Sequence, residues 1–230
     1  MALVLGLNSN TGYTDHGDLA AMNSAPALTV AFWNWVGVVV APGEIAKSNV
    51  SFFAMNTGRE YRVRHQGVWS LITPRDTIVE DIYAHYAMVY DGTLDVTTRV
   101  KVYKNAASLP LTGMDGISPQ GSVADATAGT TLPDMSGNGL LNGNTNSSGD
   151  FAHYRVWSAA LSQAEVAQEM HRYWANRRTD LLFDAPYDDQ LYARDYSGNG
   201  NHGTWNPING TPEQRQGPPV SYGGKVLVTG

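Results

Sequence analysis

The sequence contains no cysteine, and only 16% of its 230 residues are charged. Without cysteine the chain can form neither disulfides nor thiolate metal sites. The formal net charge is -6, and no block of lysine or arginine supplies the positive surface that a phosphate backbone requires. We therefore expect no nucleic-acid partner.

A long apolar run is also missing at the start of the chain. The first ten residues, MALVLGLNSN, carry no basic residue, and their apolar stretch stops at Asn8. A secretory signal peptide needs a basic start and a longer apolar core. We therefore expect a protein that is made in the cytoplasm without Sec export and that has no membrane partner.

Catalytic patterns are absent as well. The sequence has no G-x-S-x-G elbow, no H-E-x-x-H helix and no P-loop, and its six histidines lack metal-ligand spacing. A glycosidase needs two carboxylates flanking the scissile bond. Glu80 and Asp81 would point to opposite faces of a strand, and Asp188 and Asp189 lie in a turn-like stretch. We predict that the protein is not an enzyme.

What the chain does have is the composition of a β protein. Hydrophobic residues make up 42% of the sequence, enough to bury a core in one domain, and 24 glycines punctuate short β-branched and aromatic runs. From Glu60 to Leu71 the residues alternate, with Tyr61 and Val63 on one side and Arg62 and Arg64 on the other. This alternation predicts a strand with one solvated face.

The clearest local pattern is DFAHYRVWSAALSQAEVAQEM, residues 150–170. Its first half is aromatic and β-branched, as in a strand. Ser162 followed by Glu165 has the spacing of a capping box, which predicts a helix from Ser162 to about Asn176. At helical spacing, one face of that helix would carry Val166, Met170, Tyr173 and Trp174.

This segment resembles the last core strand and following helix of the concanavalin A-like, laminin G-like jelly-roll family. The family's acidic pair at the start of the strand is replaced by Ala152 and His153. Residues 28–36, 85–92 and 100–105 are similar to earlier family strands, in the expected order. The matching residues of the first segment are Arg155, Val156, Trp157, Ala160, Leu161 and Ser162.

The resemblance covers roughly residues 13–175 and implies an all-β, two-sheet antiparallel jelly-roll sandwich with one short helix. We place the jelly-roll domain at residues 11–206, between extended terminal arms at 1–10 and 207–230. The family's D-x-S-G-N-G-N-x-G segment, usually near the start of the domain, stands here at 195–203. This displacement indicates a circular permutation, whose moved strand closes either its own sandwich or a neighbour's.

The segment D-x-S-G-N-G occurs twice, at 134–139 and 195–200, and offers candidate ligand residues. Asp134, Asn138, Asp195 and Asn199 carry the hard oxygen ligands that Ca²⁺ prefers. The resemblance implies that such loops bind calcium. The alternative is that these side chains form Asx turns while the glycines adopt positive φ.

Aromatic side chains are candidates for stacking on sugar rings. Trp33 and Trp35 share one face of a predicted strand, which is either a sugar platform or the buried inner face of the sandwich. Trp205 follows the glycine loop, and we predict that it is an exposed ligand-binding residue.

Two functions fit this pattern. Our leading interpretation is a non-catalytic structural protein on the surface of a virus particle, a bacteriophage capsid decoration or cement protein. Its partners would be other capsid subunits and further copies of itself, and release by lysis would replace export. The alternative is a lectin or adhesin module that binds surface glycans through the loops around Asp134 and Asp195.

Overall fold

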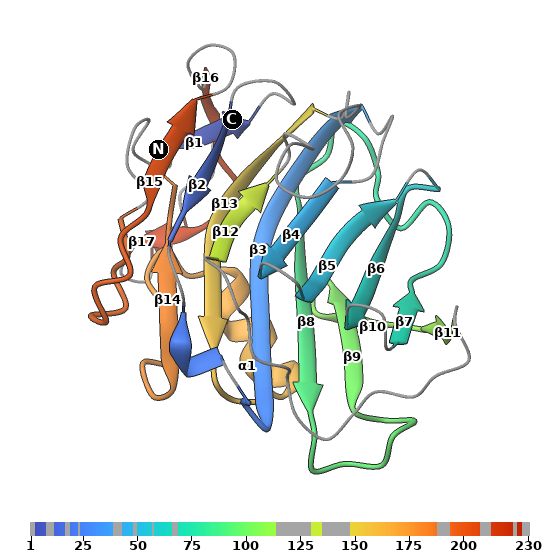
Figure 1. Cartoon of the computed structure of the whole chain (residues 1–230). Helices are drawn as coiled ribbons and strands as arrows, with labels where there is room; N and C mark the ends of the chain where they lie inside the picture. The colour runs from blue at the N-terminus through green and yellow to red at the C-terminus, as the bar shows by residue number, and fades with distance from the viewer. Residues whose placement is uncertain are drawn as a thin grey trace.

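The chain folds into two antiparallel β-sheets with one α-helix among the residues that the structure, a computed structural model, describes. Figure 1 shows the two sheets stacked face to face, with the helix behind the rear sheet. The structure describes residues 3–7, 12–16, 19–22, 24–38, 43–47, 50–56, 58–65, 69–113, 130–134, 148–187, 194–207, 213–222 and 225–226.

The rear sheet, sheet A, has eight strands in the order β10-β9-β8-β3-β13-β1-β16, with β14 also paired to β13. Its long central pair, β3 and β13, brings together segments more than 100 residues apart. The strands are β10 (Ala107–Leu109), β9 (Val100–Lys104), β8 (Ala84–Asp91), β3 (Ala27–Val38), β13 (Ser148–Trp157), β1 (Leu3–Leu7), β16 (Glu213–Gln216) and β14 (Leu181–Ala185).

The front sheet, sheet B, also has eight strands, in the order β11-β7-β6-β5-β4-β12-β2-β15. Two small elements lie outside both sheets, the 3-10 turn Ala20–Met22 and the ribbon of β17 (Ser221–Tyr222) and β18 (Lys225–Val226). The strands of sheet B are β11 (Thr112–Gly113), β7 (Trp69–Ile72), β6 (Glu60–His65), β5 (Val50–Asn56), β4 (Gly43–Lys47), β12 (Thr130–Asp134), β2 (Gly12–Asp15) and β15 (Thr204–Pro207).

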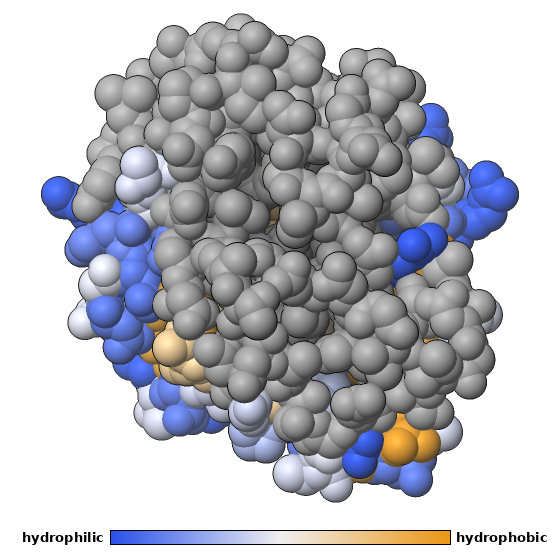
Figure 2. Space-filling model, in the orientation of Figure 1, coloured by the Kyte–Doolittle hydropathy of each residue, from blue (hydrophilic) through white to orange (hydrophobic). Residues whose placement is uncertain are grey.

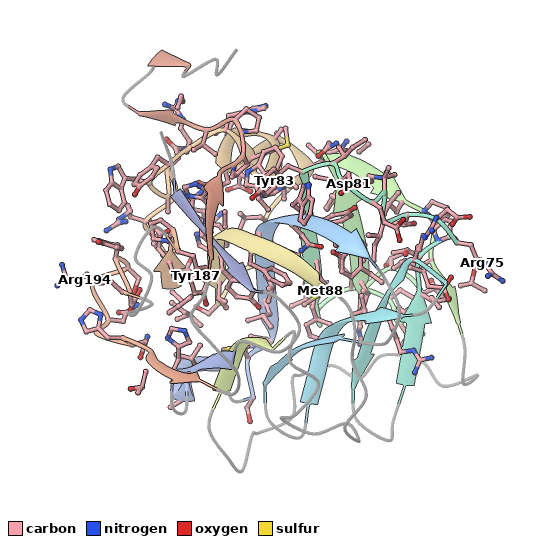
Figure 3. The ribbon with its side chains drawn as sticks, turned by 90° about the horizontal axis from the view of Figure 1, so that it is seen from above. Arg75, Asp81, Tyr83, Met88, Tyr187 and Arg194 are labelled. Carbon is pink, nitrogen blue, oxygen red and sulfur yellow. The ribbon has the colours of Figure 1, made fainter. Side chains whose placement is uncertain are left out.

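The main core lies between the two sheets. Tyr61 and Val63 of β6 are buried, which confirms the side predicted to face the core. Phe32 stacks on Tyr154 with ring centroids 5.6 Å apart. Met88 joins the same cluster and lies between the sheets in the view of Figure 3.

A second core lies on the other face of sheet A, because the helix covers it. Along β3 the odd positions Ala31 and Trp33 face this side, opposite Phe32. Val166 of the helix and Leu161 before it pack against this face of the sheet. The central strands of sheet A, β3 and β13, are therefore buried on both faces. In Figure 2 the coloured side chains at the margins of the view are mostly hydrophilic.

The helix α1 (Gln163–Met170) begins as predicted but ends earlier. The Ser162 hydroxyl accepts a hydrogen bond from the Glu165 amide, and the Glu165 carboxylate accepts one from the Ser162 amide, so the capping box is confirmed. The helix ends at Met170, and the predicted extension to Asn176 is wrong. No helix among the described residues is long and apolar enough to span a membrane.

Both terminal segments contribute to the sheets of the same chain. β1 lies between β13 and β16 in sheet A, with Leu3 opposite Gln216. The segment that the sequence predicts to be displaced also pairs within the chain, since β14 joins β13 and β15 joins β2. The permutation itself stays a prediction. After β16, Val220 is buried against Trp33 and Tyr173.

Candidate functional site

An open hollow of about 360 Å³ lies on the surface, where the loop after α1 meets the glycine-rich loop before β15. Its lining residues are Trp174, Ala175, Arg178 and Tyr196. Its volume falls within the roughly 300–1,000 Å³ of known ligand sites. Trp174 is 42% exposed, which is unusual for so large an apolar side chain. The centroids of the Trp174 and Tyr196 rings are 4.8 Å apart, and the planes of the two rings are inclined by 59°.

Trp174 is held outward by its two neighbours along the chain. Tyr173 and Ala175 are both buried, so the backbone is anchored on either side of the tryptophan. The Trp174 ring also stands edge-on to the Tyr173 ring, with centroids 4.6 Å apart. An exposed aromatic that is fixed in this way loses little conformational freedom when a ligand binds.

A buried guanidinium, that of Arg155 on β13, holds the backbone under Trp174. Arg155 Nη2 donates to the carbonyl oxygens of Arg172 and Tyr173, at 2.7 and 2.6 Å. Arg155 Nη1 donates to the Glu169 carbonyl at 3.0 Å, and Nε donates to Asp184 Oδ1 at 2.9 Å. These bonds use carbonyls that a longer helix would need for itself, which explains why α1 ends at Met170.

Two buried carboxylates hold the next part of the loop through its amides. Asp184 Oδ2 accepts a hydrogen bond from the Ala175 amide at 3.2 Å. Glu169 accepts from the amides of Asn176 and Arg177, at 2.9 and 2.6 Å. The loop from 172 to 177 is thus bonded to the sheet and the helix through both its carbonyls and its amides.

The opposite wall of the hollow is set by Asp195. Asp195 Oδ1 accepts from the amides of Asp184 and Ser197, at 3.1 and 2.8 Å. Oδ2 accepts from the Asn201 amide and the Ser197 hydroxyl, at 3.0 and 2.8 Å. Tyr196, which follows Asp195, donates its own amide to the Asp184 carbonyl at 2.8 Å. The Asp195 carboxylate therefore positions the loop that carries the Tyr196 ring.

Asn199 also helps to fix this loop, through its side-chain amide. Its Nδ2 donates to the carbonyls of Leu181 and Leu182, at 2.8 and 3.1 Å. Gly198 and Gly200 adopt φ of +97° and +75°, the left-handed conformations that glycine permits. Asp195 thus forms an Asx turn, because its carboxylate accepts from the Ser197 amide, whereas Asn199 ties the loop to residues 181 and 182. Direct contact of either residue with a ligand stays a prediction.

Calcium binding also stays a prediction. Within the described ranges, no group of three or more His, Cys, Asp or Glu residues could hold a metal ion. Asp134 lies in β12 with Glu44 opposite it, but its side chain lies outside the described part of the structure. Asn138 lies outside the described residues altogether. The Asx-turn geometry is therefore established for the second copy of the repeated segment alone.

The structure places the three predicted aromatic candidates in different surroundings. Trp33 is buried, and its Nε1 donates to the Met170 carbonyl at 2.9 Å. It therefore serves neither as a sugar platform nor in the core between the sheets, because it lies under the end of α1. Trp35 is half-buried. Trp205 lies in β15 opposite Thr14, and its side chain lies outside the described part.

Sequence reasoning missed the pair that forms the hollow. Helical spacing predicts Trp174 on the apolar face of a helix, but that helix ends four residues earlier. Tyr196 stands at the variable position of the repeated segment, where the first copy has Met135. The aromatic Tyr196, present in the second copy of the repeat but not in the first, is the sequence feature that could have pointed to this site.

Two buried histidines lie near the site, beneath the loop that carries Trp174. His153 stands edge-on to Tyr173, and His85 edge-on to Trp33, with centroids 5.1 and 5.5 Å apart. Burial, together with the smaller effect of the positive charge of Arg155, lowers the pKa of His85 to about 3 and that of His153 well below its usual value. Both rings are therefore neutral at neutral pH.

No sequence model of a known family matches the chain, and no curated protein matches it. Its fold is similar to that of a candidate carbohydrate binding protein of Bacteroides ovatus, with a TM-score of 0.66 and 15% identity. That likeness covers 96% of this chain and 62% of the other, so the chain spans less than two thirds of its relative's length.

Two weaker likenesses are to animal and toxin proteins. The heptameric SAP-like pentraxin of Limulus polyphemus gives a TM-score of 0.38 at 20% identity, over 64% of this chain and 71% of the other. The botulinum neurotoxin serotype D ligand binding domain gives 0.44 at 12% identity, over 62% and 35%. The chain is a two-sheet antiparallel jelly-roll sandwich, as predicted, and its place in the laminin G-like branch stays a prediction.

Proposed function

We propose that the protein is a non-catalytic glycan-binding module and that Trp174 and Tyr196 form its sugar-binding surface. The observation that carries this proposal is the exposed Trp174 ring, held beside Tyr196 in an open hollow. Sugar rings present flat C–H faces with hydroxyls at their edges. Aromatic side chains with a polar tip match such a surface, because they offer an apolar face and a hydrogen-bonding group together.

The support under the hollow favours binding over a purely structural role. The hydrogen bonds of Arg155, Asp184 and Glu169 fix the loop that carries Trp174 before any ligand arrives. A prearranged site avoids the entropic cost of ordering loops on binding. The fold agrees with this proposal, since the similar Bacteroides ovatus protein is itself named as a candidate carbohydrate binder.

A glycan array tests the proposal. The purified chain should bind a subset of glycans, and Trp174→Ala should weaken that binding roughly tenfold or more, as loss of an aromatic anchor does. The matched control is Ile82→Ala, because Ile82 is 57% exposed but does not line the hollow. Absence of binding to any glycan, or equal binding by Trp174→Ala, would reject the proposal.

We propose as a second candidate a structural role on a virus particle, as a bacteriophage capsid decoration or cement protein at the virion surface. The observation that favours it is the position of β16, which ends the order of the described strands in sheet A. An edge strand can accept a strand from another subunit. Light scattering and co-sedimentation with phage particles test this role. A monomer that never co-sediments with particles would remove it.

A further inference from the structure

The one charged group among the four residues that line the hollow is Arg178, and its side chain is 53% exposed. Arg178 Nη2 donates to the Tyr196 carbonyl at 2.8 Å. Arg178 Nη1 lies 3.6 Å from Asp184 Oδ2. These two contacts orient the planar guanidinium against the wall of the hollow, next to the Tyr196 loop.

The carboxylate behind Arg178 is already engaged by other donors. Asp184 is completely buried, so it presents no oxygen to the hollow. Its Oδ1 accepts from Arg155 Nε at 2.9 Å, and its Oδ2 accepts from the Ala175 amide at 3.2 Å. Asp184 therefore shares its negative charge between two guanidinium groups. The side of Arg178 that faces solvent remains a positively charged donor surface.

A surface of this kind has a definite ligand preference. Of the four lining residues, none has a carboxylate to accept hydrogen bonds from sugar hydroxyls. A planar guanidinium instead matches a carboxylate, to which it can donate two parallel charge-assisted hydrogen bonds. Trp174 and Arg178 line the same hollow, so a sugar ring stacked on Trp174 would lie in the space that Arg178 borders.

Resting on the proposed glycan-binding function, we infer that the hollow selects acidic saccharides, with Arg178 binding the sugar carboxylate while Trp174 stacks on the ring. Arg178 is then the specificity-determining residue, and Trp174 supplies affinity for acidic and neutral sugars alike. The selection would weaken as salt is added, because Arg178 is half exposed and its charge is screened.

The test uses matched pairs of ligands, namely oligosaccharides ending in glucuronic, galacturonic or sialic acid and the methyl esters of the same compounds. Calorimetric titration of the full chain should show an acid that binds roughly tenfold more tightly than its ester, since the ester lacks the charge. Arg178→Gln should remove this difference, so that the acid and its ester bind equally. Arg178→Lys should restore part of it, because lysine keeps the charge without the planar fork.

Arg59→Gln is the matched control, because Arg59 is also about half exposed but pairs with Glu80 away from the hollow. Equal binding of acid and ester, or an acid preference that survives in Arg178→Gln, overturns the inference while glycan binding stands. A sulfated glycan that outcompetes the carboxylates also overturns it. If nothing binds, acid or ester, the proposed function itself fails.

Discussion

Arg155 Nε lies 2.9 Å from Asp184 Oδ1, and the two side chains are 3% and 0% exposed. The residues stand directly opposite each other on β13 and β14. Glu169 of α1 supplies a second carboxylate 3.4 Å from Arg155 Nη1. This buried network joins the helix, the sheet and the loop that carries Trp174, so the fold and the candidate site depend on the same group.

Replacement of Arg155 tests that dependence. Arg155→Met leaves the buried Glu169 without its cation and leaves Asp184 with the more distant Arg178, so we expect the free energy of unfolding to fall by about 3–5 kcal/mol. Urea denaturation measures this loss. The control is Arg59→Met, which breaks an exposed ion pair with Glu80 and should cost less than about 1 kcal/mol. Equal losses in both variants would show that the buried network does not hold the loop.

The glycines of the Asp195 loop give a second test. Gly198 has φ of +97°, and a methyl group at this position would meet no atom within 4 Å, so the cost of substitution is purely conformational. We expect Gly198→Ala to destabilise the protein by about 1–2 kcal/mol. Gly113 has the same open surroundings without a positive φ, and Gly113→Ala should be close to neutral. Thermal melting of each variant measures the difference. Equal shifts of the melting temperature in Gly198→Ala and Gly113→Ala would contradict the turn geometry.

The buried histidines predict a dependence of stability on pH. The pKa of His85 falls from 6.5 to about 3 on folding, so between these values the unfolded chain binds a proton that the folded chain excludes. The folded state is therefore most stable above about pH 6.5. As the pH falls from there towards about 3, the free energy of unfolding decreases by about 1.4 kcal/mol per pH unit. His153 acts in the same direction.

Chemical denaturation at several pH values measures that slope. His85→Gln should reduce it, and His153→Asn should do so while keeping a residue that tolerates the φ of +50° at this position. His171→Gln serves as the control, because His171 is exposed. If neither His85→Gln nor His153→Asn changes the dependence of the unfolding free energy on pH, other groups cause the acid sensitivity.

Calcium gives a further test at the Asp195 loop. Both Asp195 oxygens accept hydrogen bonds from N–H or O–H donors, which would have to be displaced before an ion could bind. We therefore expect that Asp195 contributes nothing to any effect of millimolar calcium on the melting temperature. A rise with calcium that disappears in Asp195→Ala would instead assign this carboxylate to an ion.

The parts of the structure that could be predicted are those set by residues close in sequence. The capping box needs only Ser162 and Glu165, and the alternation of Tyr61 and Val63 follows from the pleat of one strand. Both are local, so the sequence displays them directly. The two-sheet sandwich followed from several such strands together with the family resemblance.

The parts that could not be predicted depend on distant contacts. The helix ends at Met170 because Arg155, 15 positions earlier, binds the carbonyls that follow it, and no glycine or proline marks this end. The exposure of Trp174 depends on that early end. Trp33 likewise lies on the outer face of sheet A because α1 covers it, a relation that the strand sequence does not contain.

The structure of the protein bound to the tightest glycan from the array tests the central claim most directly. We predict a sugar ring against Trp174 and Tyr196 in the hollow, with Arg178 beside the ligand. A glycan bound elsewhere, with the hollow empty, would contradict this prediction.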